Sequence, residues 1–148
     1  MRIDELATED YGAAIELWHV CGLTRPWNDP AADLGRALTG ASSTVLAAST
    51  DDGALAGTAM VGHDGHRGWL YYLAVDPARR REGVGRALVR AAERWLADRG
   101  IPKVQLMLRA GNTGSAAFYE ALGYRDQEVR VMGRFFDEAL EARRGSAT

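Results

Sequence analysis

Residues 73–86 read LAVDPARRREGVGR. The segment passes from an apolar run through a proline turn into three arginines, two closely spaced glycines and an amphipathic stretch. This pattern predicts a buried strand, a loop and a helix start, where backbone N–H groups freed of side chains by glycine can bind an anion. Arginines beside a helix N-terminus cost about 0.3–1 kcal/mol per charge. A bound polyanion best explains them, and a pyrophosphate would fit.

Two other phosphate-binding loops are excluded by the same residues. A P-loop ends in Gly-Lys-Ser or Gly-Lys-Thr, whereas Gly85 is followed by Arg86. The dinucleotide-binding fingerprint requires a third small residue where this chain has Leu88. It also requires an early β-α-β unit, and here the pattern predicts antiparallel strands first.

The composition is that of one ordinary soluble domain. The chain has 148 residues, 47% apolar and 26% charged, with a formal net charge of −2. We therefore expect a single domain over residues 1–148 that binds neither nucleic acid nor an anionic membrane. Cys21 is the one cysteine, the opening residues lack the apolar core of a secretory signal, and no apolar run reaches the ~20 residues of a membrane span. A cytoplasmic protein is expected.

Hydrophobic periodicity and helix-breaking residues predict the order of the elements. Strands are expected at residues 2–6, 44–48, 55–61, 69–75, 104–108 and 129–136. Helices are expected after a Thr8 cap and at residues 31–38, 84–96 and 113–122, with fraying at residues 143–148. This order predicts a mixed α/β domain, in which one sheet carries helices on its faces.

Two motifs resemble the signatures of the GNAT superfamily of N-acetyltransferases. Residues 80–85 (RREGVG) match its Arg/Gln-x-x-Gly-x-Gly/Ala signature, and Asn112 followed by residues 119–124 (YEALGY) resembles its second signature at the usual spacing. Residues 24–30 (TRPWNDP) and 64–68 (DGHRG) resemble more narrowly the bacterial YpeA-like branch. The resemblance extends along nearly the whole chain and implies the splayed sheet of the GNAT fold, with acetyl-CoA as the acyl donor.

The resemblance also implies where the donor binds. Backbone groups of Leu73, Ala74 and Val75 would pair with the pantetheine arm like an added strand, although without the signature these residues would be interpreted as plain core. A backbone N–H near Leu73 or Ala74 would stabilise the oxyanion. The remaining coenzyme contacts would come from Arg80, Arg81, Glu82, Gly83, Val84, Gly85, Arg86, Asn112 and Tyr119.

Tyr119 is the candidate general acid. Acyl transfer expels a thiolate whose thiol has a pKa of about 8.5, and a tyrosine with a pKa of about 10 can give it a proton. Tyr119 lies seven residues after Asn112, so the two are expected on one helix face. The alternative is a packing role for the ring. Phe118 and Leu122, on another face, are expected in the core.

The general base is left open. Positions that hold a glutamate in some relatives hold Trp69 and Met107 here. The loop residues Trp27, Asn28 and Asp29 would border the acceptor pocket or simply clamp their loop. No spacing of His, Cys or Asp suggests a metal site. The remaining candidates for the base are His63, His66, Asp29, Asp64, Tyr71 and a water chain.

We therefore expect an enzyme that moves the acetyl group of acetyl-CoA to a primary amine. The amine would belong to a protein N-terminus, a lysine or a small metabolite, and the enzyme could form a homodimer. Because the usual acids are missing, the alternative is a non-catalytic acyl-CoA-binding sensor or protein-interaction module of the same fold. A nucleic-acid binder is disfavoured by the net charge and by the absence of interleaved aromatic residues in the arginine-rich stretch.

Overall fold

The structure is a computed structural model that describes residues 1–146. The chain forms two compact units, residues 1–106 and residues 107–148. In the described part of the chain, every helix is too short or too polar to cross a membrane.

The first unit is built on a five-stranded sheet with the strand order β1-β2-β3-β4-β5. The first four strands pair antiparallel with their neighbours, and β5 runs parallel to β4. Glycines in the left-handed region make the two hairpin turns, Gly53 with φ 87° and Gly65 with φ 86°. This mixed sheet confirms the predicted fold class. The strands are β1 (Arg2–Glu5), β2 (Ser43–Ser49), β3 (Leu55–His63), β4 (Gly68–Val75) and β5 (Val104–Leu106).

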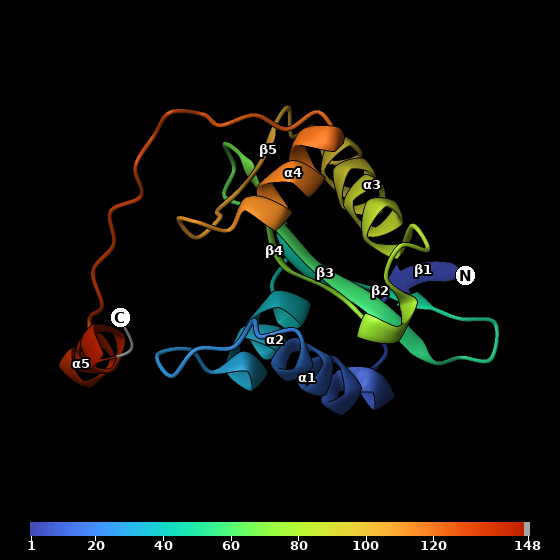
Figure 1. Cartoon of the computed structure of the whole chain (residues 1–148), viewed down its shortest axis with the longest axis horizontal. Helices are drawn as coiled ribbons and strands as arrows, with labels where there is room; N and C mark the ends of the chain where they lie inside the picture. Colours follow the sequence, from blue (N-terminus) through green and yellow to red (C-terminus); the bar gives the residue numbers. More distant parts are fainter. Residues whose placement is uncertain (147–148) are drawn as a thin grey trace. The chain divides into compact units, whose positions relative to one another are not determined.

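Helices cover both faces of this sheet (Figure 1), with α1 (Tyr11–Val20) and α2 (Pro30–Thr39) on one face and α3 (Val84–Ala97) on the other. Helix α2 begins at Pro30, which suits a first helical position, and the Asp29 side chain accepts a hydrogen bond from the Ala32 N–H at 3.1 Å. Helix α3 follows the predicted apolar stripe. Its buried residues are Val84, Leu88, Val89, Ala92 and Leu96.

The core between the sheet and the first two helices is centred on the fully buried Trp18. Its indole N–H donates to the hydroxyl of Thr58 at 2.8 Å, so the one polar atom of this ring is satisfied inside the core. The other buried members of the cluster are Leu6, Ala14, Leu17, Leu34, Ala37, Val45, Ala47 and Ala74.

The second unit contains α4 (Thr113–Ala121) and α5 (Glu138–Ser146). The predicted strand at residues 129–136 is wrong, because this segment has no regular structure and Val129, Met132 and Phe136 are 75%, 95% and 95% exposed. Alternation alone does not make a strand, since a strand also needs a paired edge. Helix α5 instead forms where fraying was expected. Its residues 138–144 are good helix formers, with acids in the first turn and arginines in the last; residues 147 and 148 lie outside the described residues.

Smaller corrections concern the ends and faces of helices. Thr8 does not cap α1 but opens a short 3₁₀ turn, η1 (Thr8–Asp10), because the chain turns before the helix begins. Strand β5 stops at Leu106 rather than residue 108. Phe118 and Leu122 are only half-buried, and Tyr119 is the buried residue of α4.

Close packing of α3 on β3 requires a glycine at position 57. A Cβ there would lie 2.7 Å from the Ala74 carbonyl oxygen and 2.9 Å from the Leu88 Cδ1. We expect Gly57→Ala to lower the free energy of unfolding by about 1–3 kcal/mol, measured by urea denaturation. The control is Gly12→Ala in α1, where nothing lies within 4 Å; it should raise stability by up to about 1 kcal/mol. Equal stability of Gly57→Ala and the unsubstituted protein would contradict this packing.

Candidate active site

Strand β4 is paired unequally on its two sides. Its pairing with β5 covers three positions and ends where Leu70 faces Leu106. On the other side, β4 pairs with β3 from Gly68 to Val75. Within the first unit, residues 71–75 therefore have no strand partner on the β5 side, as the splayed sheet of the resemblance implies. An extended molecule carrying amide groups can pair with such a free edge.

The unpaired half of β4 contains a β-bulge. The register pairs Thr58 with Ala74 and Met60 with Tyr71, so Tyr72 and Leu73 lie opposite Ala59 alone. Tyr72 has φ 50°, which is unusual for a residue with a side chain. Such bulges re-aim the backbone of a strand. The bulge includes Leu73 and directly precedes Ala74 and Val75, and these three are the residues predicted to contact the donor.

The loop after β4 forms an open helix N-terminus. A short turn, η2 (Pro77–Arg79), is held by the Asp76 carboxylate, which accepts from the Ala78 N–H at 3.0 Å. Arg81 and Gly83 then adopt left-handed conformations, with φ 67° and 82°. Gly83 is the N-cap of α3 and has no side chain to satisfy the first N–H groups of the helix. These N–H groups can bind an anion.

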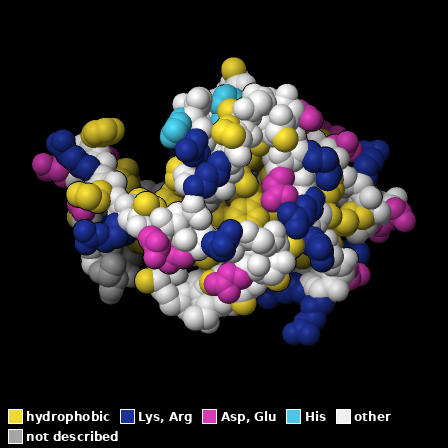
Figure 2. Space-filling view, turned by 90° about the horizontal axis from the view of Figure 1, so that it is seen from above, with side chains coloured by type: hydrophobic (Ala, Val, Ile, Leu, Met, Phe, Trp, Pro, Cys, Tyr) yellow, Lys and Arg dark blue, Asp and Glu magenta, His cyan; other side chains and the backbone are white. Residues whose placement is uncertain are grey.

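Exposed arginines surround this N-terminus. Arg80, Arg81 and Arg86 are exposed, and none makes an ion pair with another residue of the described chain. On the face in Figure 2, basic side chains are dispersed among acidic, neutral and apolar groups.

Asn112 and Tyr119 lie in the second unit. Asn112 is the N-cap of α4, where its Oδ1 accepts from the Ser115 N–H at 3.1 Å, so it starts the helix that contains Tyr119. The Tyr119 ring packs edge-on against Phe118 and Tyr124, with centroids 5.0 Å and 5.5 Å apart. Burial raises the pKa of Tyr119 to about 12. The phenol is therefore protonated near neutral pH and keeps a proton with which it can donate a hydrogen bond.

The structure narrows the candidates for the general base. Backbone N–H groups of Arg67 and His66 and the Trp69 indole donate to the Asp64 carboxylate and lower its pKa to about 2, so it is a weak base. Burial, and secondarily Asp64, raise the pKa of Tyr71, which keeps this phenol neutral. The Nδ1 of His63 already accepts from the Gly65 N–H at 3.2 Å.

The loop before α2 has one buried and two exposed candidate residues. Trp27 is buried, which favours its role as a clamp of the loop. Asn28 and Asp29 are exposed, and Asp29 is engaged as the N-cap of α2. These positions leave an acceptor role for the loop as a prediction.

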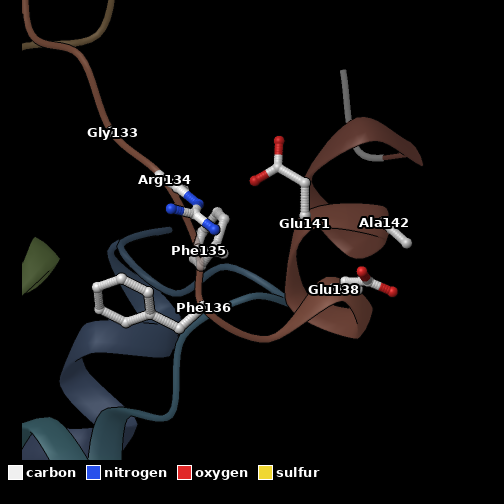
Figure 3. A pocket seen from close by; sticks show the side chains of 7 residues that line it. All are labelled: Gly133, Arg134, Phe135, Phe136, Glu138, Glu141 and Ala142. Carbon is white, nitrogen blue, oxygen red and sulfur yellow. The ribbon is translucent and has the colours of Figure 1, made fainter.

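A separate hollow of about 560 Å³ lies in the second unit, between residues 133–136 and helix α5 (Figure 3). Phe135, Phe136, Arg134, Glu138 and Glu141 are among its lining residues. It includes no residue of either signature, and we do not assign the reaction to it. The described residues contain no cluster of His, Cys, Asp or Glu that could hold a metal ion.

Comparison with known proteins decides the family. A family model described as the acetyltransferase (GNAT) family matches residues 3–124. The chain belongs to the GNAT family. An acetyltransferase of Pectobacterium atrosepticum is 40% identical over 141 residues, which are 95% of this chain and 99% of that protein. Assignment to the YpeA-like branch stays a prediction.

Solved structures share this GNAT fold. An aminoglycoside 6′-N-acetyltransferase from Acinetobacter haemolyticus is 20% identical with a TM-score of 0.75, and the match covers 93% of this chain and all of that one. An N-acetyltransferase from Escherichia coli, which acts on a ribosomal-protein alanine, is 27% identical with a TM-score of 0.73, over 87% of this chain and 80% of that one. This GNAT protein is an acetyltransferase that transfers an acetyl group to an amine, and its family uses acetyl-CoA.

Sequence analysis missed the residues that hold the bulge of this GNAT protein. Tyr72 and Thr58 fall inside the strands predicted at residues 69–75 and 55–61, and neither they nor Trp18 were given a role in the site. No local pattern marks them, because Trp18 and Thr58 are 40 positions apart and meet only in the folded chain. The one available signal was a pair of polar-tipped residues, a tryptophan and a threonine, at positions expected to be buried.

The open N-terminus of α3 gives a testable site. We expect Gly83→Asp to abolish acetyl-CoA binding in calorimetry, because it places a carboxylate where the helix presents its N–H groups. Any side chain is also strained at φ 82°. The matched control is Gly53→Asp, which has a similar φ of 87° and open space, in the β2–β3 turn; it should leave the affinity unchanged. A folded Gly83→Asp variant with normal affinity would disprove the anion site.

Proposed function

We propose that this enzyme binds acetyl-CoA along the unpaired half of β4 and the N-terminus of α3, and transfers the acetyl group to a primary amine. The observation that carries the proposal is the direct succession of these two features in 13 residues, from Tyr71 to Gly83. The free edge suits a chain of amide groups, and the helix N-terminus suits a pyrophosphate. We further propose that residues 1–148 act as one functional domain, in the cytoplasm, where the free thiol of Cys21 would stay reduced.

The residues that would hold the donor divide by chemistry. Backbone groups of Leu73, Ala74 and Val75 would bind the amides of the arm. The N–H groups at the start of α3, from Val84 to Arg86, would bind the pyrophosphate, with Arg80 and Arg81 adding charge. When bound, acetyl-CoA supplies an activated thioester. The Leu73 N–H would donate to its carbonyl oxygen as that oxygen gains negative charge.

Tyr119 is the proposed acid for the departing thiolate. Support comes from the second signature and from its neutral, buried phenol, whose pKa of about 12 keeps the proton in place. A phenol this weak does not give its proton up fully to a thiolate whose thiol has a pKa of about 8.5. Its contribution is therefore a hydrogen bond that strengthens as negative charge develops on sulfur.

The acceptor amine is proposed to lose its proton to water. The carboxylate of Asp64 and the phenol of Tyr71 are unsuited as bases, and Asp29 is engaged in capping α2. The amine must then arrive neutral, since only the free base is nucleophilic. The pocket is proposed to be bordered by Tyr71 and by the loop of Trp27, Asn28 and Asp29. Its acceptor would be a small-molecule amine, a lysine or a peptide N-terminus.

The proposal is tested by measuring coenzyme A release against a panel of amines, lysine peptides and peptide N-termini. For the acceptor that reacts best, kcat/KM should rise about tenfold per pH unit and level off at the pKa of the amine, near 8 for a peptide N-terminus or near 10.4 for a lysine. A bell-shaped profile centred on another pKa would indicate a protein base and overturn the water mechanism. Failure of every amine to react would overturn the assignment of the site.

Substitution of Tyr119 tests the acid. Tyr119→Phe should lower kcat by about 10- to 1000-fold and change acetyl-CoA affinity little, because only the hydroxyl is lost. Because its pKa is raised to about 12, Tyr119 stays protonated to higher pH than an ordinary tyrosine, and kcat should show no falling limb near pH 10. Tyr11→Phe, in α1, is the control and should retain full activity. Unchanged kcat in Tyr119→Phe, with chemistry limiting turnover, would remove Tyr119 from the mechanism.

A further inference from the structure

The bulge of β4 is held in a conformation that its own sequence does not favour. Tyr72 occupies the left-handed region with φ 50°, although it carries a bulky side chain. Residues in such conformations persist only where their surroundings hold them, and they concentrate at functional sites. The next residue is Leu73, the proposed donor to the thioester carbonyl. The contacts that fix Tyr72 therefore influence the direction in which the Leu73 N–H group points.

Two hydrogen bonds in series fix the backbone of Tyr72. The Trp18 indole N–H donates to the Thr58 hydroxyl at 2.8 Å, and the Thr58 hydroxyl donates to the Tyr72 carbonyl oxygen at 3.0 Å. Trp18 and Thr58 are both 0% exposed, so no water competes for these groups. Because the indole can only donate, it leaves the hydroxyl hydrogen of Thr58 to the carbonyl. The donor and acceptor roles in this relay are therefore fixed: the indole donates to the hydroxyl, and the hydroxyl donates to the carbonyl.

The side chain of Tyr72 is fixed as firmly as its backbone. Its ring stacks on Trp18 with centroids 3.9 Å apart and an interplanar angle of 13°. Its hydroxyl donates at 2.8 Å to the Asp33 Oδ2 on α2, whose other oxygen is paired with Arg36. Burial, and then the Asp33 hydrogen bond, raise the pKa of Tyr72, so this phenol remains a donor. Helices α1 and α2 thus both hold one residue of β4.

We infer that Trp18, Thr58 and Asp33 are positioning residues. They hold Tyr72 in its left-handed conformation and thereby aim the backbone N–H of Leu73 at the acyl oxygen of the donor. This inference rests on the proposed function for the role of Leu73. It goes beyond that function because it proposes that a buried tryptophan–threonine relay orients the hydrogen bond from Leu73 to the acyl carbonyl of the donor. None of the three residues touches the reacting atoms.

The test uses the isosteric substitution Thr58→Val in the full chain. Acetyl-CoA labelled with carbon-13 at the acetyl carbonyl is bound without an acceptor, and its NMR chemical shift reports the hydrogen bond to the carbonyl oxygen. In Thr58→Val the shift should return most of the way to that of free acetyl-CoA, while the Kd changes by less than about threefold. With the reactive amine, kcat should fall by roughly 10- to 100-fold at unchanged acceptor KM.

Two variants separate positioning from packing. Thr58→Ser keeps the hydroxyl and should restore the bound chemical shift and most of kcat. Thr44→Val is the matched control, since Thr44 is a buried threonine of β2, 5% exposed, whose hydroxyl has no hydrogen-bond partner among the described residues. It should leave the chemical shift and kcat unchanged, and the melting temperature should be unchanged or slightly higher. Equal damage in Thr58→Ser and Thr58→Val would overturn the relay.

If Thr58→Val does not fold, Tyr72→Phe carries the test, because it removes only the hydroxyl that binds Asp33. It should move the bound carbonyl shift part of the way to the free value and lower kcat by about threefold to tenfold. An unchanged shift and kcat would overturn the inference. A carbonyl shift equal to the free value in the unsubstituted enzyme would instead disprove the proposed role of Leu73. If the shift is perturbed in the unsubstituted enzyme but no variant alters it, the positioning role of Trp18, Thr58 and Asp33 is disproved and the role of Leu73 stands.

Discussion

Strand β4 is paired along its whole length on one side and over only three positions on the other. This inequality organises the first unit. The paired side ties β4 to an antiparallel sheet that is packed on both faces by helices. The free side leaves backbone amide groups of a rigid strand available, and a rigid backbone positions a ligand with less loss of entropy than a mobile loop. The loop that follows this strand leads directly to the start of α3.

The proposed anion site depends on conformation more than on charge. Gly83 places the N-terminus of α3 in the open without a capping side chain, and Asp76 holds the turn that leads there. The net charge of −2 gives the protein no general attraction for polyanions. Recognition must therefore be local, from directed N–H groups and from the few arginines beside them. This explains how a slightly acidic protein belongs to a family that uses a highly anionic coenzyme.

The fold could be predicted wherever local periodicity and packing agree. The stripe of α3 from Val84 to Leu96 is amphipathic at helical spacing and is buried as expected. Residues 129–136 alternate as a strand does, yet they have no regular structure, because pairing depends on an available edge and not on pattern. The turn and the helix start after β4 could be predicted because proline and glycine mark them in sequence. The conformation of Tyr72 could not be predicted, because the residues that hold it are distant in sequence. Thr58, Asp33 and Trp18 lie 14, 39 and 54 positions away.

The buried relay beneath β4 also constrains how this chain can change over evolutionary time. Loss of the Thr58 hydroxyl removes a partner both from the Trp18 indole N–H and from the Tyr72 carbonyl oxygen in a buried interior, which is costly. Substitution at position 58 is therefore best tolerated where position 72 is a glycine that adopts φ 50° unaided. A lineage can exchange the relay for a glycine only if the glycine at position 72 comes before the loss of the hydroxyl. Ancestry, as much as chemistry, then determines which solution a given descendant retains.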